Sequence, residues 1–374
     1  MKQYCCAEVT AILDKVPMVK NLARKKFIVL FVLAMIKTRS VQFCEVAQAL
    51  NDEVKASSNE VRIQDFFREV SLDYEQVALL LAMFLPKRGK VTLCIDRTEW
   101  DFGKCQVNIL MIVVRCKHIT IPLYWELLDN NSGNSNTDDR IGLLKKCIRL
   151  LGGRIGLFLG DREFIGHRWL KFIKDQGIRF CVRVPKHHKI TRQVGLNEHV
   201  HTVEQLLQGR KTLRLSGCRV DGIWGNVYAK ALKDGDLLFL FGTAKAAFLA
   251  QLYKKRWRIE CYFQNVKKRG FDLESTHLRD LDKLKKLVAL VSIAYSVVAN
   301  VGLHQHLRRK AIAIKNHGYK ENSFARRGID IVREGLRRVW KRNFQLFLDL
   351  VIRFCVGCRS ILIIYLCLIF SRVE

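Results

Sequence analysis

Apolar residues recur along the first 85 positions at the spacing of helices. Residues 27–36 form an apolar run, residues 41–50 place apolar side chains three and four positions apart, and an amphipathic segment covers 62–67 after the polar link 57–60. Two short helices joined by a polar turn are typical of a helix-turn-helix, and a plain helical layer has the same pattern. We expect residues 1–88 to be helical, with both interpretations open.

The pattern changes after residues 86–89, which combine proline and glycine. Five apolar, β-rich runs predict strands at 91–95, 107–114, 118–125, 156–160 and 178–184. A helix that Asp138 or Asp139 caps separates the third strand from the fourth, and another helix, ending near Asp175, separates the fourth from the fifth. The order β-β-β-α-β-α-β predicts an α/β fold with a mixed sheet.

The second half of the chain begins with short strands and turns and then becomes helical. The β-rich stretch reads as a module inserted between two helix-bearing halves, and two long helices and a basic tail follow it. We therefore expect five regions: helical 1–88, core 89–184, β-rich insertion 185–243, helical second part of the core 244–310, and basic C-terminal region 311–374.

Composition narrows the class of partner. The 374 residues carry 65 Lys and Arg against 35 Asp and Glu, a net charge of +30, although 49% are apolar and only four are proline. A disordered basic tail is thereby excluded, and an excess of this size indicates a polyanion, either nucleic acid or an anionic membrane surface. The basic C-terminal region is expected to bind DNA phosphates, and the possible helix-turn-helix makes 1–88 a candidate DNA-binding region.

The 13 cysteines are scattered, and residues 1–10 lack the apolar segment of a secretory leader. We therefore expect reduced, mostly buried thiols and a cytoplasmic protein. Cys355 and Cys358 form a lone C-x-x-C without a second pair, so we expect no zinc site there.

Two apolar stretches raise the question of a membrane. Residues 287–307 carry no charge and are long enough to span a bilayer, but they include serine, asparagine, glutamine and histidine. A helix buried against a sheet explains them better, so we expect no membrane partner. Residues 361–370 are too short to span and are either a packed last strand or the end of an altered reading frame, which would put activity in doubt.

Two aspartates occupy positions suited to chemistry. Asp96 and Asp161 each follow an apolar run, and the predicted order allows the two strands to be neighbours. Two adjacent carboxylates repel unless a cation lies between them, and oxygen ligands of this kind suit Mg²⁺ or Mn²⁺. Strand ends also carry aspartate for ordinary turn formation.

The predicted helix over about residues 244–268 supplies a third acid. Tyr253, Arg256, Glu260 and Lys267 are spaced by three, four and seven positions, so they lie along one helix face. A solvated helix with an Arg256–Glu260 ion pair explains the same spacing. Apolar neighbours such as Ile259 indicate that the helix also has a packed side.

The order Tyr253-x₂-Arg256-x₃-Glu260-x₆-Lys267 resembles the Y-R-E-K signature of the insertion-sequence-four family of bacterial DDE transposases. Residues 96–100 (Asp-Arg-Thr-Glu-Trp) resemble the surroundings of the family's first catalytic Asp. Residues 160–164 (Gly-Asp-Arg-Glu-Phe) resemble those of its second. A β-rich insertion before the Glu also fits the family, and residues 323–328 resemble a further family feature. The resemblance covers about residues 90–327.

The resemblance implies an RNase H-like catalytic domain in which Asp96, Asp161 and Glu260 hold two divalent ions, Mg²⁺ or Mn²⁺. Two metals between carboxylates suit phosphodiester cleavage, because they activate the attacking oxygen and stabilise the leaving one. The implied reaction is cut-and-paste transposition, in which the transposon ends are cleaved and a 3′-hydroxyl is transferred to target DNA.

The implied partners are double-stranded DNA, as terminal inverted repeats and as target, and a second copy of the chain that brings two ends together. By resemblance, the backbone near the cut is contacted by Tyr253, Arg256 and Lys267. Arg162 is a further candidate for a phosphate contact, and Trp257 and Trp224 are both available to stack on an extruded base. The implied location is the bacterial cytoplasm, in association with the nucleoid.

Three other functions stay open. A structure-selective nuclease or recombinase of the same fold would cut branched DNA without the repeats. An inactive DNA-binding remnant of a transposase would bind DNA without cutting it, although the presence of all three acids argues against it. A membrane protein is the last alternative.

Overall fold

The computed structural model describes residues 18–19, 21–102, 105–116, 118–128, 133–233, 235–316 and 318–339. Cys355, Cys358 and the apolar segment 361–370 lie outside these residues, as does all of the chain after residue 339. The helices before the sheet are α2 (Leu22–Thr38), α3 (Phe43–Leu50), α4 (Ala56–Glu69) and α5 (Tyr74–Ala82).

Aromatic packing holds these first helices together. The ring centroids of Phe27 and Phe66 lie 4.6 Å apart, and those of Phe31 and Phe67 lie 5.5 Å apart. Residues 57–60, expected as a polar link, belong instead to α4, because the buried Asn59 amide donates hydrogen bonds to the carbonyls of Ala47 (3.0 Å) and Asn51 (2.9 Å). The polar residue thus joins α4 to α3.

The core of the chain is one mixed sheet with flanking helices. Its first five strands are β1 (Val91–Phe102), β2 (Cys105–Arg115), β3 (Thr120–Leu127), β4 (Ile155–Gly160) and β5 (Phe180–Arg183). Helix α6 (Thr137–Leu151) and the short turn η1 (Gly152–Arg154) precede β4, and α7 (His167–Asp175) precedes β5. The predicted order is confirmed, although Asn136 and neither of the two aspartates caps α6.

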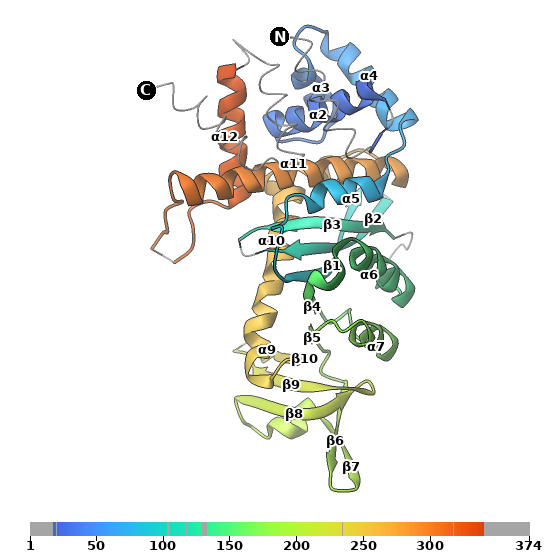
Figure 1. The fold of residues 1–374 in the computed structure, drawn as a ribbon, viewed down its shortest axis with the longest axis vertical. Coiled ribbons are helices and arrows are strands. Elements are labelled where there is room, and N and C mark those ends of the chain that lie inside the picture. Colours follow the sequence, from blue (N-terminus) through green and yellow to red (C-terminus); the bar gives the residue numbers. More distant parts are fainter. Residues whose placement is uncertain are drawn as a thin grey trace.

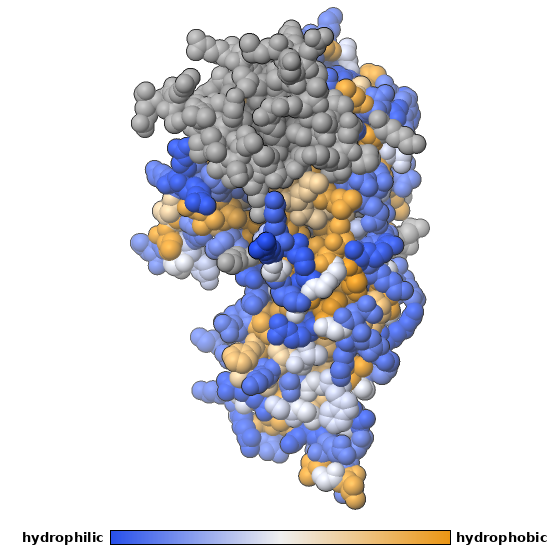
Figure 2. All heavy atoms as spheres, in the orientation of Figure 1, coloured by the Kyte–Doolittle hydropathy of each residue, from blue (hydrophilic) through white to orange (hydrophobic). Residues whose placement is uncertain are grey.

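The insertion extends this same sheet. It comprises β6 (Lys189–Val194), β7 (Asn197–Thr202), α8 (Val203–Leu207), β8 (Thr212–Val220), β9 (Ile223–Ala231) and β10 (Leu237–Gly242). Because β10 pairs antiparallel with β5, the ten strands form one sheet in the order β3-β2-β1-β4-β5-β10-β9-β8-β6-β7. The tip of the β6–β7 hairpin is apolar at the bottom of the view in Figure 2, and Leu196 there is 99% exposed.

A long helical segment returns from the insertion to the core (Figure 1). It consists of α9 (Ala246–Tyr253), the 3₁₀ turn η2 (Lys254–Arg256), α10 (Trp257–Gln264) and the π-helical turn η3 (Asn265–Arg269). In Figure 1 it runs along one side of the sheet while α6 and α7 lie on the other, and α10 contacts β1. The α/β class with a mixed sheet and helical terminal regions is therefore confirmed.

The last described elements are the turn η4 (Leu273–Ser275), α11 (Leu281–Arg308) and α12 (Phe324–Val339). Helices α11 and α12 cross with their backbones in contact. A Cβ on Gly328 would lie 1.7 Å from the carbonyl oxygen of Val298, and one on Gly302 would lie 1.8 Å from that of Phe324. Only glycine allows this approach, which gives a physical role to the glycine that ends the segment 323–328.

Helix α11 is also the one single helix in the described ranges that is long and apolar enough to cross a membrane. Helices α2 and α3 are long and apolar enough only when taken together, and the chain bends by 109° between them. In α11, 83% of the most apolar 18-residue stretch is buried inside the protein, and the helix packs on α2, α12 and β3. These are the properties of a core helix, as expected from the sequence.

Seven cysteines in the described part of the chain are free thiols. Five are buried: Cys94, Cys116, Cys147, Cys181 and Cys218. Cys44 is exposed and Cys261 is half-buried. The expectation of mostly buried free thiols is confirmed for these positions.

Candidate active site

Strand pairing brings the two predicted aspartates together. Strand β1 pairs in parallel with β4, and the last matched pair is Cys94 with Leu159. Asp96 and Asp161 each lie two residues beyond that pair, at the same edge of the sheet. The parallel register therefore places two carboxylates side by side, as the sequence predicted.

Strand β1 does not end at Asp96, contrary to the sequence-based expectation. It continues to Phe102, because β2 pairs with it along its whole length, from Thr92 with Arg115 to Phe102 with Cys105. Only the pairing with β4 stops before Asp96. At Asp96, β1 is therefore paired with β2 on one side only, because its pairing with β4 has already ended.

The helical segment α9–η2–α10 directs three polar side chains at these aspartates. The hydroxyl of Tyr253, the last residue of α9, donates a 2.8 Å hydrogen bond to Oδ1 of Asp161. Arg256 ends the 3₁₀ turn, and Glu260 lies one turn later in α10. The neighbouring apolar residues Ile259 and Tyr262 are buried and anchor the segment on the core.

The guanidinium of Arg256 lies among all three acids. Its Nη1 is 2.8 Å from Oδ2 of Asp96, its Nη2 is 3.6 Å from Oδ2 of Asp161, and Nη2 also donates to Oε1 of Glu260. Arg256 is only 8% exposed. The i,i+4 pair with Glu260 that a plain helix would make is therefore present, but it belongs to a cluster of four charged groups from three elements.

Burial and like charge shape the electrostatics of this acidic cluster, defined as Asp96, Asp161 and Glu260. Burial raises the pKa of Asp96 to about 6, with smaller contributions from Asp161 and Glu260, while Arg256 and the backbone N–H of Arg97 act in the opposite direction. Although burial alone would lower the pKa of Arg256, Tyr253 and the three carboxylates raise it above its ordinary value. The guanidinium is therefore a permanent cation in this site.

The donor set of the acidic cluster fits a hard divalent cation. Carboxylate oxygens are the ligands that Mg²⁺ and Mn²⁺ prefer, and three carboxylates from β1, the loop after β4 and α10 surround the Arg256 guanidinium. Within the described ranges, no group of three His, Cys, Asp or Glu side chains is arranged to hold a metal ion. In this arrangement the positive charge among the carboxylates is that of Arg256.

Lys267, the last residue of the signature, lies farther along β1. Its ammonium is 2.6 Å from Oε1 of Glu274, donates a 3.0 Å hydrogen bond to the carbonyl of Glu99, and lies 5.6 Å from the ring centroid of Trp100. It occupies the π-helical turn η3, a departure from α-helical geometry that is frequent at functional sites. The four signature residues thus divide into three at the acidic cluster and one beside it.

The other predicted DNA contacts lie around the cluster. Arg162, next to Asp161, pairs with Asp236 at 2.5 Å, so its charge is shared with the insertion. Trp257 is 57% exposed beside Arg256, and Trp224 is 42% exposed in the insertion, where its ring lies 5.4 Å from the Arg219 guanidinium carbon. Both indole rings are accessible, and nothing in their exposure selects between them.

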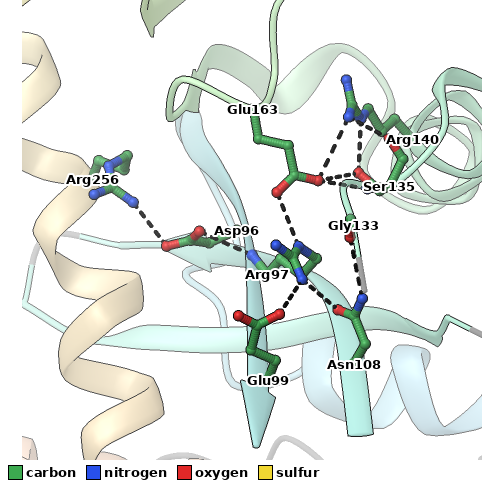
Figure 3. A network of polar contacts seen from close by, with 9 residues as sticks. All are labelled: Asp96, Arg97, Glu99, Asn108, Gly133, Ser135, Arg140, Glu163 and Arg256. Atoms are coloured by element: carbon green, nitrogen blue, oxygen red, sulfur yellow. Dashed lines mark hydrogen bonds and ion pairs between the residues drawn. The ribbon is translucent and has the colours of Figure 1, made fainter. Parts of the chain in front are cut away.

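A second polar network lies on the other face of β1 (Figure 3). Neighbouring residues of a strand point to opposite faces, so Asp96 faces Arg256 whereas Arg97 faces α6. The Arg97 guanidinium donates to Glu163 (3.1 Å), Glu99 (2.5 Å) and Asn108 (3.2 Å). Its backbone N–H also donates to Oδ1 of Asp96 (2.9 Å).

Glu163 links this network to the second aspartate. It lies two residues after Asp161, and its Oε1 accepts hydrogen bonds from the backbone N–H and the hydroxyl of Ser135, both at 2.7 Å. Arg140 of α6 is 3.5 Å from the same oxygen and donates to the Ser135 hydroxyl. The strand that carries Asp96 and the loop that carries Asp161 are therefore tied together through Arg97 and Glu163.

Sequence reasoning did not assign a role to Arg97, Glu163, Ser135 or Arg140. The available signal was the period of two in β1, which puts Arg97 and Glu99 on one face and Asp96 on the other. Ending the predicted strand at Asp96 removed that signal. The contribution of Ser135 depends on a loop that joins the network only in three dimensions.

The fold and the site together define an RNase H-like α/β domain of the transposase type. Residues 88–297, more than half of the chain, match the family described as the transposase DDE domain. The chain therefore belongs to this family, whose domains cleave DNA and generally depend on divalent metal ions. A comparison with curated proteins gives no match.

Proposed function

We propose that this protein is a cut-and-paste transposase of the insertion-sequence-four type, which cleaves the ends of its own element and joins them to target DNA. The observation that carries the proposal is the convergence of Asp96, Asp161 and Glu260 on the guanidinium of Arg256. Three acids from distant parts of the chain, held at the edge of a sheet, are what metal-dependent phosphodiester cleavage requires. The spacing of Tyr253, Arg256, Glu260 and Lys267 supports the assignment to this family branch.

In this proposal the acidic cluster holds two Mg²⁺ or Mn²⁺ ions, which supply activation of the attacking oxygen and stabilisation of the leaving oxygen. The protein holds the carboxylates in position. Asp96 is fixed by its paired strand and by the Arg97 N–H, and Tyr253 orients Asp161 through its hydroxyl. Glu260 approaches from the helix, so the phosphate would lie between the sheet edge and α10.

DNA binding in this proposal rests on cations and rings around the cluster. Arg256, Lys267, Tyr253 and Arg162 contact phosphates near the cut, and Trp257 or Trp224 stacks on an extruded base. The excess of Lys and Arg elsewhere would bind phosphates without reading sequence. Two copies of the chain would hold two ends of the element, and we propose a cytoplasmic, nucleoid-associated protein.

The direct test is metal-dependent cleavage of a duplex that carries the inverted repeat found next to the gene. Wild-type protein should nick it with Mg²⁺ or Mn²⁺, and Glu260→Gln should lose cleavage while retaining DNA binding. Glu204→Gln makes the same change at an exposed position of α8 and should cut at the wild-type rate. Cleavage by Glu260→Gln at the parental rate would remove Glu260 from the site.

The same assay separates the alternatives. A structure-selective nuclease would cut branched or flapped DNA without the repeats and would ignore the inverted-repeat duplex. An inactive remnant would bind the duplex and cut neither substrate under any metal condition.

A further inference from the structure

The acidic cluster already contains a cation of the protein's own. Arg256 uses both terminal nitrogens on the three carboxylates that the proposed ions require, and it does so from a position that is 8% exposed. Its Nε is buried and has no hydrogen-bond partner among the described residues. The guanidinium is thus firmly placed between the acids, but one of its donors is left unsatisfied.

Metal ions and this guanidinium compete for the same oxygens. A divalent ion that enters the cluster meets a permanent positive charge a few ångströms away, and like charges at that distance in a mostly buried site repel strongly. The ion also needs the lone pairs that Arg256 now uses. Full metal coordination therefore requires Arg256 to move to another anion.

The local structure allows such a movement and indicates its direction. Arg256 lies in the 3₁₀ turn η2 between α9 and α10, and a 3₁₀ stretch within a helix often marks a hinge. Lys254 and Arg258 flank it and are exposed, so a DNA phosphate is drawn to this turn. A phosphate accepts two parallel hydrogen bonds from a guanidinium and can replace the carboxylates as its partner.

We propose that Arg256 determines when the metal site forms: it acts as the counter-ion of the acidic cluster in free protein and releases the carboxylates when a DNA phosphate binds its guanidinium. This inference rests on the proposed function. If Arg256 acts in this way, metal-dependent hydrolysis is confined to DNA that already occupies the site, which makes cleavage specific for bound DNA. Metal and DNA must also strengthen each other's binding by one common factor, since linkage between two sites is reciprocal.

The test measures Mn²⁺ binding by electron paramagnetic resonance of the free ion, on the full chain, with and without the inverted-repeat duplex. Wild-type protein should bind Mn²⁺ about 10-fold or more tightly with DNA, within the usual range of coupling between sites. Arg256→Gln should bind Mn²⁺ equally tightly with and without DNA. Arg168→Gln removes the same charge from an exposed position of α7, on the other side of the sheet, and should keep the wild-type dependence on DNA.

The outcomes distinguish a failure of the proposed role of Arg256 from a failure of the proposed function. Equal Mn²⁺ binding by wild-type protein with and without DNA, or an Arg256→Gln variant that still needs DNA, overturns the role of Arg256 alone. Absence of Mn²⁺ binding in every variant, with DNA bound, overturns the metal site itself. Should Arg256→Gln not fold, wild-type protein still tests the proposal, because Mn²⁺ binding that does not tighten when DNA is bound overturns it.

Discussion

Arg256 donates a 2.8 Å hydrogen bond from Nη1 to Oδ2 of Asp96, a residue 160 positions earlier in the chain. This contact joins the helix that carries Glu260 to the strand that carries the first aspartate. The return of the chain after the insertion thus brings the segment that carries Glu260 beside Asp96. The insertion therefore separates the acids in sequence without separating them in space.

Loss of Glu163 should destabilise the fold. Glu163→Leu removes the carboxylate that Arg97 and Arg140 share and leaves Arg97, among the described residues, with the carboxylate of Glu99 alone. The side chains of Arg97, Arg140 and Glu163 are only 17%, 6% and 13% exposed. Removing one partner of such a pair typically costs about 3 kcal/mol. Urea denaturation followed by circular dichroism measures the free energy of unfolding.

Glu198→Leu is the matched control, because Glu198 pairs with Arg219 at a position where its side chain is 52% exposed. Its cost should stay below about 1 kcal/mol. Equal costs for the two variants would show that the network on the α6 face of β1 contributes no more than a surface ion pair.

The crossing of α11 and α12 should not tolerate a methyl group. Gly328→Ala places a Cβ 1.7 Å from the carbonyl oxygen of Val298, so the helices must separate, at a cost of about 2 kcal/mol or more. Gly142→Ala, inside α6 with nothing within 4 Å of the new Cβ, should instead be neutral or stabilise by about 0.5–1 kcal/mol. Thermal unfolding of both variants compares the two effects, and a stable Gly328→Ala protein would contradict the close crossing.

Thiol accessibility tests the position of β1. Burial raises the pKa of Cys94 to about 12, so this thiol should stay protonated and unreactive as the pH rises from 7 to 9. Cys44 is exposed and should be alkylated first in native protein. Peptide mapping after treatment with iodoacetamide distinguishes the two. Labelling of Cys94 as fast as Cys44 in folded protein would place β1 at the surface.

Much of the core follows from the apolar runs, because a buried strand or helix needs a continuous apolar side. The runs at 91–95 and 156–160 locate β1 and β4, and the charges that follow them locate Asp96 and Asp161. The far half of β1 escaped this reasoning, since its residues Arg97 and Glu99 are charged and pair with each other on one face of the strand, so the sequence has no continuous apolar run there.

The role of Arg256 could not be predicted for a different reason. Helical spacing accounts for its pair with Glu260, but its contacts with Asp96 and Asp161 depend on how the helical segment docks on the sheet. That docking is fixed by buried residues of the same segment, such as Ile259 and Tyr262. Sequence spacing gives the stripe of polar residues, and tertiary packing decides what the stripe faces.

The most direct measurement is the anomalous diffraction of Mn²⁺ in crystals of the protein bound to its inverted-repeat duplex. We expect manganese peaks within coordination distance of the carboxylates of Asp96, Asp161 and Glu260, with the guanidinium of Arg256 on a DNA phosphate. Manganese bound elsewhere, with the three carboxylates still around Arg256 and DNA in place, would contradict the account.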